Sequence, residues 1–591
     1  MPNWIQEKVG IMKKLIIIIL TFLLSSLALT SGQAAGVPDE QFALSSPTDG
    51  IQSMGIVVEE SQHARGVFSK LQGFTSVEKI RMKSPISSVV TCTKYGSGEC
   101  TPNKFYLFDA VLGMCKDASA YDCVTNVGAK DASGKALDVN FVEELPGRTP
   151  YEYVGDPAAN LPSGTSSFIV DIPGAPHPGG TKYQVNVELV GGKSEDNSQF
   201  NIWQFQAAIF AIRKDAGAYS PPAPALKPSD FQFYGQDSYK RITNSSSGET
   251  LSCTQATTSY CANAYPMPQN VTFSLSIKLH TRISGWLHGR LNDSSANITN
   301  TPDGNQLVEV SGTPAVVPAL LVWQHKDSLP ASIKEYYDKN PELLCQGTGF
   351  GGNIDGTNGG VCKARYFLRE LTNFTQQEMD EFLLWLPIIN DTAPYAPTQW
   401  SVQSMENNYN DPKRCFKDPT QLSGLVATNS AMYISGPPAF NAEDQSLDYK
   451  VASPHFLPDH SVFKGTYNLI IRSDVARCIY GFSAAPIKAS VSIQSSDGGT
   501  QVASTTLTES NGWLSLSAAG FTFSNPTIHV KLSQDEPVVI APAKPSTPEV
   551  VAPAPKPVTV SKKVTITCTK GKASKKVTSA KPVCPKGYVK K

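Results

Sequence analysis

The end of the chain, residues 564–591, combines a row of lysines with two cysteines and contains no acidic side chain. Lysine carries a compact, strongly hydrated charge, which suits diffuse anionic partners better than bidentate recognition of one group. The sequence therefore predicts a binding site for an anionic polymer in this segment. The residues expected to form this site are Lys570, Lys572, Lys575, Lys576, Lys581 and Lys586.

A segment of about thirty residues cannot bury enough apolar surface to fold unaided, so a covalent link is expected within it. Residues 564–568 alternate in polarity like a strand, and the glycines and prolines that follow favour turns. A disulfide that closes a loop of about 15 residues contributes roughly 3 kcal/mol in the chain-entropy description. We expect a small hairpin that holds its lysines in a fixed arrangement. The alternative is a solubilising tail without a partner, which has no need of fixed geometry.

All twelve cysteines follow residue 35, and an even number of cysteines in an exported chain indicates disulfides. Zinc is the competing interpretation, but the chain has no C-x2-C pair and no cysteine–histidine cluster at ligand spacing. Neighbouring cysteines are expected to pair, which leaves no free thiol to act as a nucleophile. The predicted pairs are Cys92 with Cys100, Cys115 with Cys123, Cys253 with Cys261, Cys345 with Cys362, Cys415 with Cys478, and Cys568 with Cys584.

The start of the chain has the pattern of a secretory signal peptide. Lys13 and Lys14 precede an apolar run over residues 15–29, and small residues follow up to Ala35. The alternative is an N-terminal membrane anchor, but the apolar run is shorter than the roughly 20 residues that a span needs. We expect cleavage near Ala35 and a secreted protein, extracellular or associated with the cell envelope, with no transmembrane segment left after the signal is removed.

The formal net charge of zero hides an asymmetry. Residues 36–555 hold 37 basic and 50 acidic side chains, whereas residues 556–591 hold eleven lysines and no acid. An acidic body with a basic tail is typical of partner binding. The expected partners are anionic cell-envelope polymers or acidic glycans, bound by the tail in a salt-sensitive way. Export and the acidic body argue against nucleic acid as a partner. The sequence does not indicate an oligomeric state.

Period-two patterns dominate the body of the chain. Residues 271–279 alternate apolar and polar side chains, as expected of a strand with one face on a core. Helical signals are few. Thr375 and Glu378 form a capping box before an apolar run that Pro387 bounds, and residues 329–344 offer a second short helix. The predicted fold class is mainly β, with several β-sandwich-like domains, a small helical insertion and a disulfide-clipped C-terminal hairpin.

Composition divides the chain into six segments. Proline-rich stretches near residue 225 and after residue 536 mark two of the boundaries, and the second stretch favours extended polyproline II. The predicted segments are a signal peptide (1–35), an N-terminal β domain (37–225), a β-rich domain with a helical insertion (226–455), a small β-sandwich (456–536), a Pro/Ala-rich linker (537–560) and a basic disulfide-stapled hairpin (561–591).

Known catalytic signatures do not occur in the sequence: it has no G-x-S-x-G, no H-E-x-x-H, no P-loop and no Rossmann fingerprint. The histidines are scattered, and no metal, cofactor or catalytic residue is predicted. Glycoside hydrolysis needs two carboxylates, which separate strands of a β fold can bring together. Acids in or near strand-like runs are Glu143, Glu144, Glu188 and Glu309. Most tryptophans stand in apolar surroundings typical of a core, and Trp286 and Trp400 are the two considered as platforms for a sugar ring.

Two stretches near the end of the chain carry a resemblance. They are "GTYNLIIRSDVARCIYGFSAAPIKASVSI…NGWLSLSAAGFTFSNPTIHVKLS" within residues 465–533 and "ITCTKGKASKKVTSAKPVCPKGYVKK" within residues 564–591. Both are similar to modules that recur at the C-termini of large exported proteins of Gram-positive-type bacteria. The resemblance implies an envelope location and a modular build, and it implies no activity.

These observations favour a secreted bacterial cell-surface protein, an adhesion or ligand-binding array held at the envelope by its basic C-terminal segment. The alternative is an extracellular polysaccharide-active hydrolase, which would show two facing carboxylates about 5–10 Å apart in an aromatic-lined cleft. A structural surface-layer component is a second alternative, recognisable by ordered self-assembly. The sequence leaves open whether the protein is an enzyme and favours a non-enzymatic role.

Overall fold

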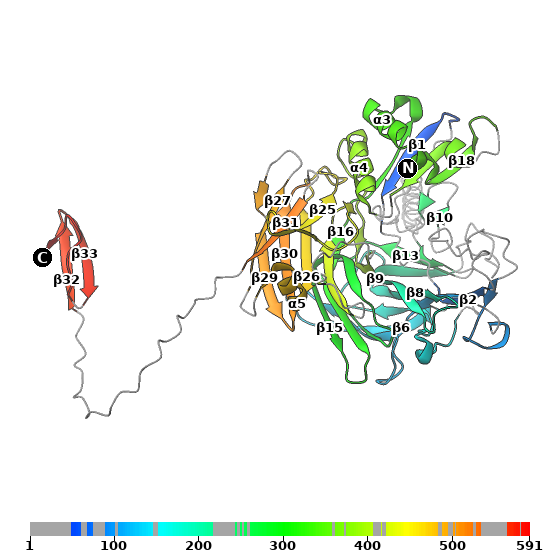
Figure 1. The fold of residues 1–591 in the computed structure, drawn as a ribbon, viewed down its shortest axis with the longest axis horizontal. Helices are drawn as coiled ribbons and strands as arrows, with labels where there is room; N and C mark the ends of the chain where they lie inside the picture. Colours follow the sequence, from blue (N-terminus) through cyan, green and yellow to red (C-terminus); the bar gives the residue numbers. More distant parts are fainter. Residues whose placement is uncertain are drawn as a thin grey trace, which may run out of the picture. The chain divides into compact units, whose positions relative to one another are not determined.

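The structure of the protein is a computed structural model, in which the chain forms two compact units, Met1–Asp535 (unit 1) and Glu536–Lys591 (unit 2) (Figure 1). The residues that it describes are 49–58, 60, 68–74, 89–100, 105–145, 152–216, 243–244, 249–250, 253–256, 260–356, 361–371, 374–405, 415, 421–482, 487–494, 500–502, 504–523, 527–533, 564–579 and 581–591. The predicted signal peptide and the predicted linker lie outside these residues. The fold is mainly β with few helices, which confirms the predicted fold class.

The first part of unit 1 is sandwich-like, because two groups of strands share one apolar core. The strands of the first group are β5 (Cys123–Lys130), β14 (Thr272–Leu279), β15 (Gly285–Asn300), β16 (Gln306–Val316) and β20 (Thr398–Gln399). The strands of the second group are β2 (Lys70–Phe74), β3 (Val89–Thr91), β4 (Phe105–Val111), β6 (Asn140–Leu145), β7 (Ser167–Asp171), β8 (Lys182–Lys193), β9 (Asn201–Ala216), β12 (Cys253–Ala256) and β13 (Tyr260–Tyr265). The long antiparallel pair β8–β9 forms the centre of the second group.

Strand β14 illustrates how the sequence builds this core. It lies between β5 and β16, and both pairings are antiparallel. The side chains of Phe273, Leu275, Ile277 and Leu279 are buried, while those between them are half-buried. Every second side chain of a strand points to the same face, so the period-two pattern confirms the predicted strand with one face on a core.

Strand β15 connects the first sandwich to a second one. Its first half pairs with β21 (Ser401–Ser404) and runs parallel to β22 (Leu422–Thr428), whereas its second half pairs with β16. The pairing with β16 shifts register between Asn292 and Ser295, and Asp293 has a positive φ of 47°. A bulge of this kind bends a strand, which lets β15 pass from one sheet into the other.

The second sandwich also has two groups of strands with a common core. One sheet continues from β22 through β26 (Gly465–Arg472) and β30 (Trp513–Phe521) to β29 (Ser504–Ser510). The other sheet has six strands: β23 (Met432–Tyr433), β24 (Ala439–Asn441), β25 (Ser446–Ala452), β27 (Lys488–Gln494), β28 (Thr500–Val502) and β31 (Thr527–Ser533). The sandwich that the sequence predicts over residues 456–536 therefore also takes strands from before residue 456.

The three domain segments predicted within unit 1 stay a prediction. Hydrogen-bonded strand pairs cross both of the predicted boundaries between them. Strand β9 pairs with β13 across the predicted boundary at residues 225 and 226. Strand β25 pairs with β31 across the predicted boundary at residues 455 and 456. A short pair of strands, β10 (Thr243–Asn244) and β11 (Glu249–Thr250), lies between β9 and β12 in the chain.

A four-stranded sheet and two helices form a further part of unit 1. The strands, in sheet order, are β17 (Leu320–His325), β1 (Ser53–Val58), β19 (Ala364–Glu370) and β18 (Thr348–Asn353), and the helices are α3 (Ala331–Lys339) and α4 (Gln376–Trp385). Both predicted helices are confirmed. The Thr375 hydroxyl accepts a hydrogen bond from the backbone N–H of Glu378 at 3.2 Å, as the capping box requires. Helix α4 ends at Trp385, two residues before Pro387.

Helix α5 (Ser473–Tyr480) is an element that the sequence analysis did not predict. It follows β26 directly, and its buried residues include Val475, Ala476 and Ile479. Gly481 ends the helix with a φ of 72°, a conformation that glycine adopts at low cost. In a helix of eight residues, the helical spacing of apolar side chains extends over only two turns. The period-two patterns of the adjacent strands therefore determined the prediction for this segment.

Five of the six predicted disulfides are confirmed, with Cα atoms 4.3–6.0 Å apart. They join Cys92 to Cys100, Cys115 to Cys123, Cys345 to Cys362, Cys415 to Cys478, and Cys568 to Cys584. The side chains of Cys253 and Cys261 lie outside the described part of the structure, so their pairing stays a prediction. No helix among the described residues is both long and apolar enough to span a membrane.

Candidate functional site

Unit 2 contains a small sheet in the strand order β33–β32–β34. The strands are β32 (Val564–Lys570), β33 (Ala573–Ser579) and β34 (Val589–Lys590). A two-residue loop joins β32 to β33, and its first residue, Gly571, has a positive φ of 60°. Glycine is the residue that tight hairpin loops favour at such a position. The backbone N–H of Lys591 donates to the carbonyl of Thr567 at 2.9 Å, which ties the chain end to β32.

The disulfide between Cys568 and Cys584 clips the segment after β33 onto β32. Cys568 is fully buried and Ile566 is 8% exposed, so these two side chains form the small apolar centre of the unit. Such a centre is too small to stabilise a fold by burial alone, and a covalent staple is the usual compensation. The disulfide therefore holds the arrangement of the surrounding lysines.

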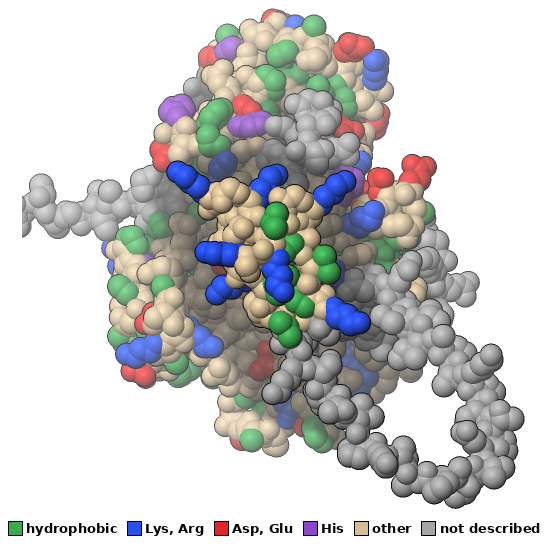
Figure 2. All heavy atoms as spheres, turned by 90° about the vertical axis from the view of Figure 1, so that its left-hand side faces the viewer, with side chains coloured by type: hydrophobic (Ala, Val, Ile, Leu, Met, Phe, Trp, Pro, Cys, Tyr) green, Lys and Arg blue, Asp and Glu red, His purple; other side chains and the backbone are tan. Residues whose placement is uncertain are grey.

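All six predicted lysines of unit 2 are exposed, and Figure 2 shows basic side chains projecting from its surface, with exposed hydrophobic side chains between them. Lys575 pairs with Cys568 and Lys576 pairs with Thr567 in the register, so these neighbouring lysines point to opposite faces of the sheet. Lys590 and Lys591, which the sequence analysis did not select, are exposed as well. The positive charges thus surround the unit, and residues 564–591 contain no acidic side chain.

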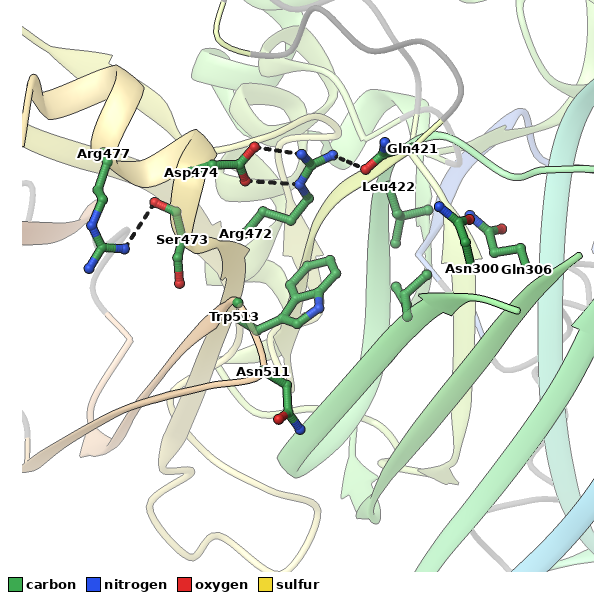
Figure 3. A pocket seen from close by; sticks show the side chains of 12 residues that line it. Asn300, Gln306, Gln421, Leu422, Arg472, Ser473, Asp474, Arg477, Asn511 and Trp513 are labelled. Carbon is green, nitrogen blue, oxygen red and sulfur yellow. Dashed lines mark hydrogen bonds and ion pairs between the residues drawn. The ribbon is translucent and has the colours of Figure 1, made fainter. Parts of the chain in front are cut away.

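A second candidate site is a pocket of about 490 Å³ in unit 1 (Figure 3). Residues of both sandwiches line it. The first sandwich contributes the end of β15 and the start of β16, and the second contributes the start of β22, the junction of β26 with α5 and the β29–β30 turn. Pockets at the junction of two structural parts are common places for ligands.

The β29–β30 turn positions the one tryptophan of the pocket. Its two-residue loop consists of Asn511 and Gly512, with φ values of 52° and 80°. Asn-Gly is the pair that favours two positive φ angles, as a type I′ turn requires. Trp513 follows the loop and pairs with Arg472 of β26. The turn therefore places the indole beside the guanidinium, as Figure 3 shows.

The charged groups of the pocket form closed pairs. Arg472 donates from Nε to Oδ1 of Asp474 at 3.0 Å, and its Nη1 donates to the side-chain oxygen of Gln421 at 2.6 Å. Arg477 donates to the two carboxylate oxygens of Glu509 at 2.7 and 3.0 Å. The hydrogen bonds from Arg477 lower the pKa of the Glu509 carboxyl, and the same carboxylate raises the pKa of Arg477. Both groups of this pair are therefore ionised at neutral pH.

The acids considered for hydrolysis are Glu143 and Glu144 on β6, Glu188 on β8 and Glu309 on β16. Glu143 forms an ion pair with Lys214 at 2.7 Å, and Glu309 accepts a hydrogen bond from Asn297 at 2.8 Å. Glu188 is fully buried and accepts from the side-chain amide of Gln206. These contacts are typical of structural residues.

The two tryptophans considered as sugar platforms do not offer an exposed ring. Trp286 and Trp400 are each 1% exposed, because both belong to the packed cores, so this interpretation was wrong. Trp203 on β9 is 54% exposed. It stands at a register shift between β8 and β9, and its ring occupies the space that a Cβ at Gly192 would need. No local signal in the sequence distinguishes this tryptophan from the buried ones.

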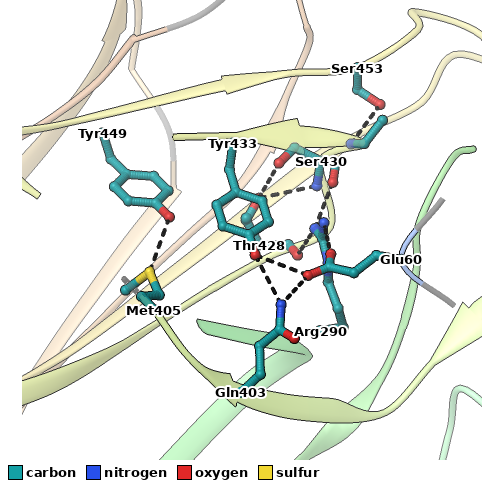
Figure 4. A network of polar contacts seen from close by, with 10 residues as sticks. Glu60, Arg290, Gln403, Met405, Thr428, Ser430, Tyr433, Tyr449 and Ser453 are labelled. Atoms are coloured by element: carbon teal, nitrogen blue, oxygen red, sulfur yellow. Dashed lines mark hydrogen bonds and ion pairs between the residues drawn. The ribbon is translucent and has the colours of Figure 1, made fainter. Parts of the chain in front are cut away.

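A buried polar network in unit 1 has the character of a structural brace (Figure 4). Arg290 of β15 forms an ion pair with Glu60, and both side chains are almost completely buried. The guanidinium also donates to the carbonyls of Thr428 and Ser430, at 3.0 and 2.6 Å. The hydroxyl of Tyr433 donates to Glu60 at 2.9 Å, and burial raises the pKa of Tyr433 far above its usual value. The network thus joins Glu60, which follows β1, to β15 and to the second sandwich, and β15 also belongs to the first sandwich.

The described histidines do not form a metal site. His280 follows the end of β14, whereas His288 lies within β15 and stacks on Tyr433 with ring centroids 3.6 Å apart. Across the described part of the chain, no group of three or more His, Cys, Asp and Glu side chains could hold a metal ion.

Comparisons of the chain with protein-family models, with curated proteins and with solved structures gave no match. The functional interpretation therefore rests on the residues of the lysine-bearing unit 2 and of the pocket in unit 1.

Proposed function

We propose that this protein is a secreted binding protein of a bacterial surface, held on anionic envelope polymers by unit 2. The observation that carries the proposal is the set of exposed lysines on a disulfide-clipped sheet whose sequence contains no acid. Unit 1 would then face its ligand as an adhesion or binding array.

The energetics support an electrostatic tether. A single exposed ion pair is worth about 0.2–1 kcal/mol, so one lysine alone would not retain the protein. Residues 564–591 contain eight lysines that can act on one polymer together, and a basic residue near an anionic surface contributes about 1 kcal/mol. Screening has a range of about 8 Å at physiological ionic strength, so added salt weakens all of these contacts. The proposed tether holds at moderate salt and releases at high salt.

The charge of the body supports an outward orientation of unit 1. Residues 36–555 carry an excess of acidic side chains, which anionic envelope polymers repel. Unit 2 is attracted to the same polymers. A protein with these two parts would bind through unit 2 and keep its larger unit away from the polymer.

The chemistry of the pocket favours binding over hydrolysis. A glycosidase needs one carboxyl group with a raised pKa, which protonates the leaving oxygen. Glu509 has a lowered pKa because Arg477 holds it ionised, and Asp474 is paired with Arg472. The Glu509 carboxyl is therefore not suited to donate a proton. The hydrolase and the surface-layer component remain alternatives without a specific supporting contact.

The test is sedimentation of the mature protein (residues 36–591) with isolated bacterial envelopes across a salt series. A variant replaces the six selected lysines of unit 2 with glutamine, and a second protein ends at Pro555. We expect the parent to pellet at low salt and to release as salt rises, while both altered proteins stay in the supernatant.

A matched control replaces six exposed lysines of unit 1 with glutamine and should pellet like the parent. Suitable positions are Lys94, Lys116, Lys130, Lys135, Lys464 and Lys531. If the unit 2 variant and the control pellet equally, the tether proposal is wrong and envelope binding resides in unit 1. If the parent itself does not pellet at low salt, the proposal fails as well.

A further inference from the structure

We infer that the pocket between the two sandwiches binds a neutral saccharide unit. This inference rests on the proposed binding function and names the chemical class of its ligand. It depends on the pocket in unit 1 alone, so it can be tested apart from the lysines of unit 2.

The charged side chains of the pocket are each held in an ion pair, which disfavours a charged ligand. Arg472 is bound in bidentate fashion by Asp474, and Arg477 is bound in the same way by Glu509. Each guanidinium already has a carboxylate as counter-ion, so an anion gains little net attraction in the pocket, and a cation would meet two arginines. With each charge already compensated, the pocket presents no net charge to a ligand.

Three neutral amide side chains of the pocket have groups available to a ligand, in contrast to the charged side chains. The side chains of Asn300 and Asn511 are exposed and have no hydrogen-bond partner among the described residues. The side-chain oxygen of Gln421 accepts from Arg472, which leaves its NH2 group without a partner in the same set. Side-chain amides can donate and accept hydrogen bonds, which matches the hydroxyl groups of a sugar.

The floor of the pocket is apolar. Leu422 is 1% exposed and Trp513 is 7% exposed, so each offers only a small part of its side chain to a ligand, and the half-buried Ile298 packs against the same core. Figure 3 shows the indole and the Leu422 side chain between the paired Arg472 on one side and Asn300 on the other. A sugar ring has an apolar C–H face and a polar rim, so it complements an apolar floor surrounded by amides. Aromatic and aliphatic floors with a few placed polar groups are usual in ligand pockets.

The size of the pocket limits the ligand. Its volume of about 490 Å³ is within the range of about 300–1,000 Å³ that small-molecule sites occupy. One or two sugar rings fit this space, and a longer chain would extend into solvent. We therefore expect recognition of a terminal or short saccharide unit.

The first experiment applies the full mature protein to an array of neutral oligosaccharides built from hexoses and N-acetylhexosamines, with sialylated and sulfated glycans beside them. Titration calorimetry with the free form of each bound neutral disaccharide then gives the Kd. The pocket variant combines Asn300→Ala with Asn511→Gly, because glycine keeps the positive φ of the turn. We expect binding of neutral glycans by the parent and at least a tenfold weaker Kd for the pocket variant.

A control variant combines Asn140→Ala with Asn390→Gly, which makes the same changes at exposed asparagines outside the pocket, one of them also at positive φ. It should bind like the parent, and equal thermal unfolding of all three proteins shows that the variants fold. The glutamine variant of unit 2 should retain glycan binding, which separates this inference from the tether. The inference is overturned if no neutral glycan binds, if acidic glycans alone bind, or if the pocket variant keeps the parent Kd.

Discussion

At the scale of single residues, the Arg290–Glu60 ion pair has the largest expected effect on stability. Both side chains are at most 3% exposed, and the guanidinium has backbone carbonyls as further acceptors. Two charges removed from water depend on each other, because the loss of one leaves the other buried and uncompensated. The pair therefore stabilises the fold only while both partners are present.

Arg290→Met tests this dependence. We expect the free energy of unfolding to fall by about 3–5 kcal/mol, the usual cost of breaking a buried ion pair. Guanidinium unfolding followed by tryptophan fluorescence measures the change. In the double variant with Glu60→Gln, the loss should be smaller than the sum of the two single losses, because no uncompensated charge remains.

An exposed ion pair provides the control. Lys339 and Glu335 lie 2.7 Å apart on α3, and their side chains are 70% and 67% exposed. Water already solvates both groups, so Lys339→Ala should leave the unfolding midpoint unchanged within error. If Arg290→Met had no larger effect than Lys339→Ala, the buried pair would not hold the parts of unit 1 together.

At the scale of elements, helix α4 depends on its N-cap. The hydroxyl of Thr375 accepts from the Glu378 N–H, one of the backbone donors that a helix start leaves unpaired. Thr375→Ala should lower the free energy of unfolding by about 1 kcal/mol, whereas Thr375→Ser keeps the acceptor oxygen and should lose much less. Denaturant unfolding of the three proteins measures this difference. Equal losses for alanine and serine would show that the cap bond contributes nothing.

The stability of the unit 2 sheet should depend on its disulfide, and this dependence is separate from the effect of its lysines. Replacing Cys568 and Cys584 with serine leaves every lysine in place, but it removes roughly 3 kcal/mol of stabilisation. That loss corresponds to about a hundredfold larger unfolded population. We expect much faster tryptic cleavage within residues 564–591, followed by mass spectrometry, together with weaker envelope binding.

The matched control for this variant removes the disulfide between Cys345 and Cys362 in unit 1. It should leave the rate of cleavage within residues 564–591 unchanged. Equal cleavage rates in the parent and in the variant without Cys568 and Cys584 would mean that the unit 2 sheet holds its form without the covalent link.

At the scale of the whole molecule, buried tyrosines make stability depend on alkaline pH. Burial raises the pKa of Tyr260 to about 12, and it raises the pKa values of Tyr183, Tyr433 and Tyr449 as well. In the unfolded chain each tyrosine ionises near its usual value of about 10. Between these values the unfolded state releases protons that the folded state keeps, so stability is full below about pH 10 and falls as the pH rises further.

Guanidinium unfolding at a series of pH values from about 8 to about 11 tests this dependence. The midpoint should fall above pH 10, and the tyrosinate absorbance of the buried tyrosines should appear together with unfolding. Tyr260→Phe removes one titrating group and should reduce the slope of stability against pH. A midpoint that stays constant through this range would contradict the expected role of burial.

Features whose sequence signals lie close together in the chain could be predicted, and features that bring distant residues together could not. Helix α4 was predictable because its cap and Pro387 lie within one short segment. The lysines of unit 2 were predictable for the same reason. The pocket was not, because Asn300, Gln421 and Trp513 come from distant parts of the chain. They meet only through the pairing of β15 with β22 and of β26 with β30, and sequence periodicity does not specify which strands pair.

The position of Glu60 also sets an order of events during synthesis. Its partner Arg290 follows 230 residues later, and Tyr433 follows 373 residues later. At a synthesis rate of about 5–20 residues per second, roughly 20–75 seconds pass before the last of these partners emerges. Until β17 and β19 have emerged, β1 has neither of these partner strands beside it, and an unpaired apolar strand readily adds to other chains. A nascent chain is therefore open to wrong partners at β1, whereas a chain that refolds after synthesis already contains β17 and β19.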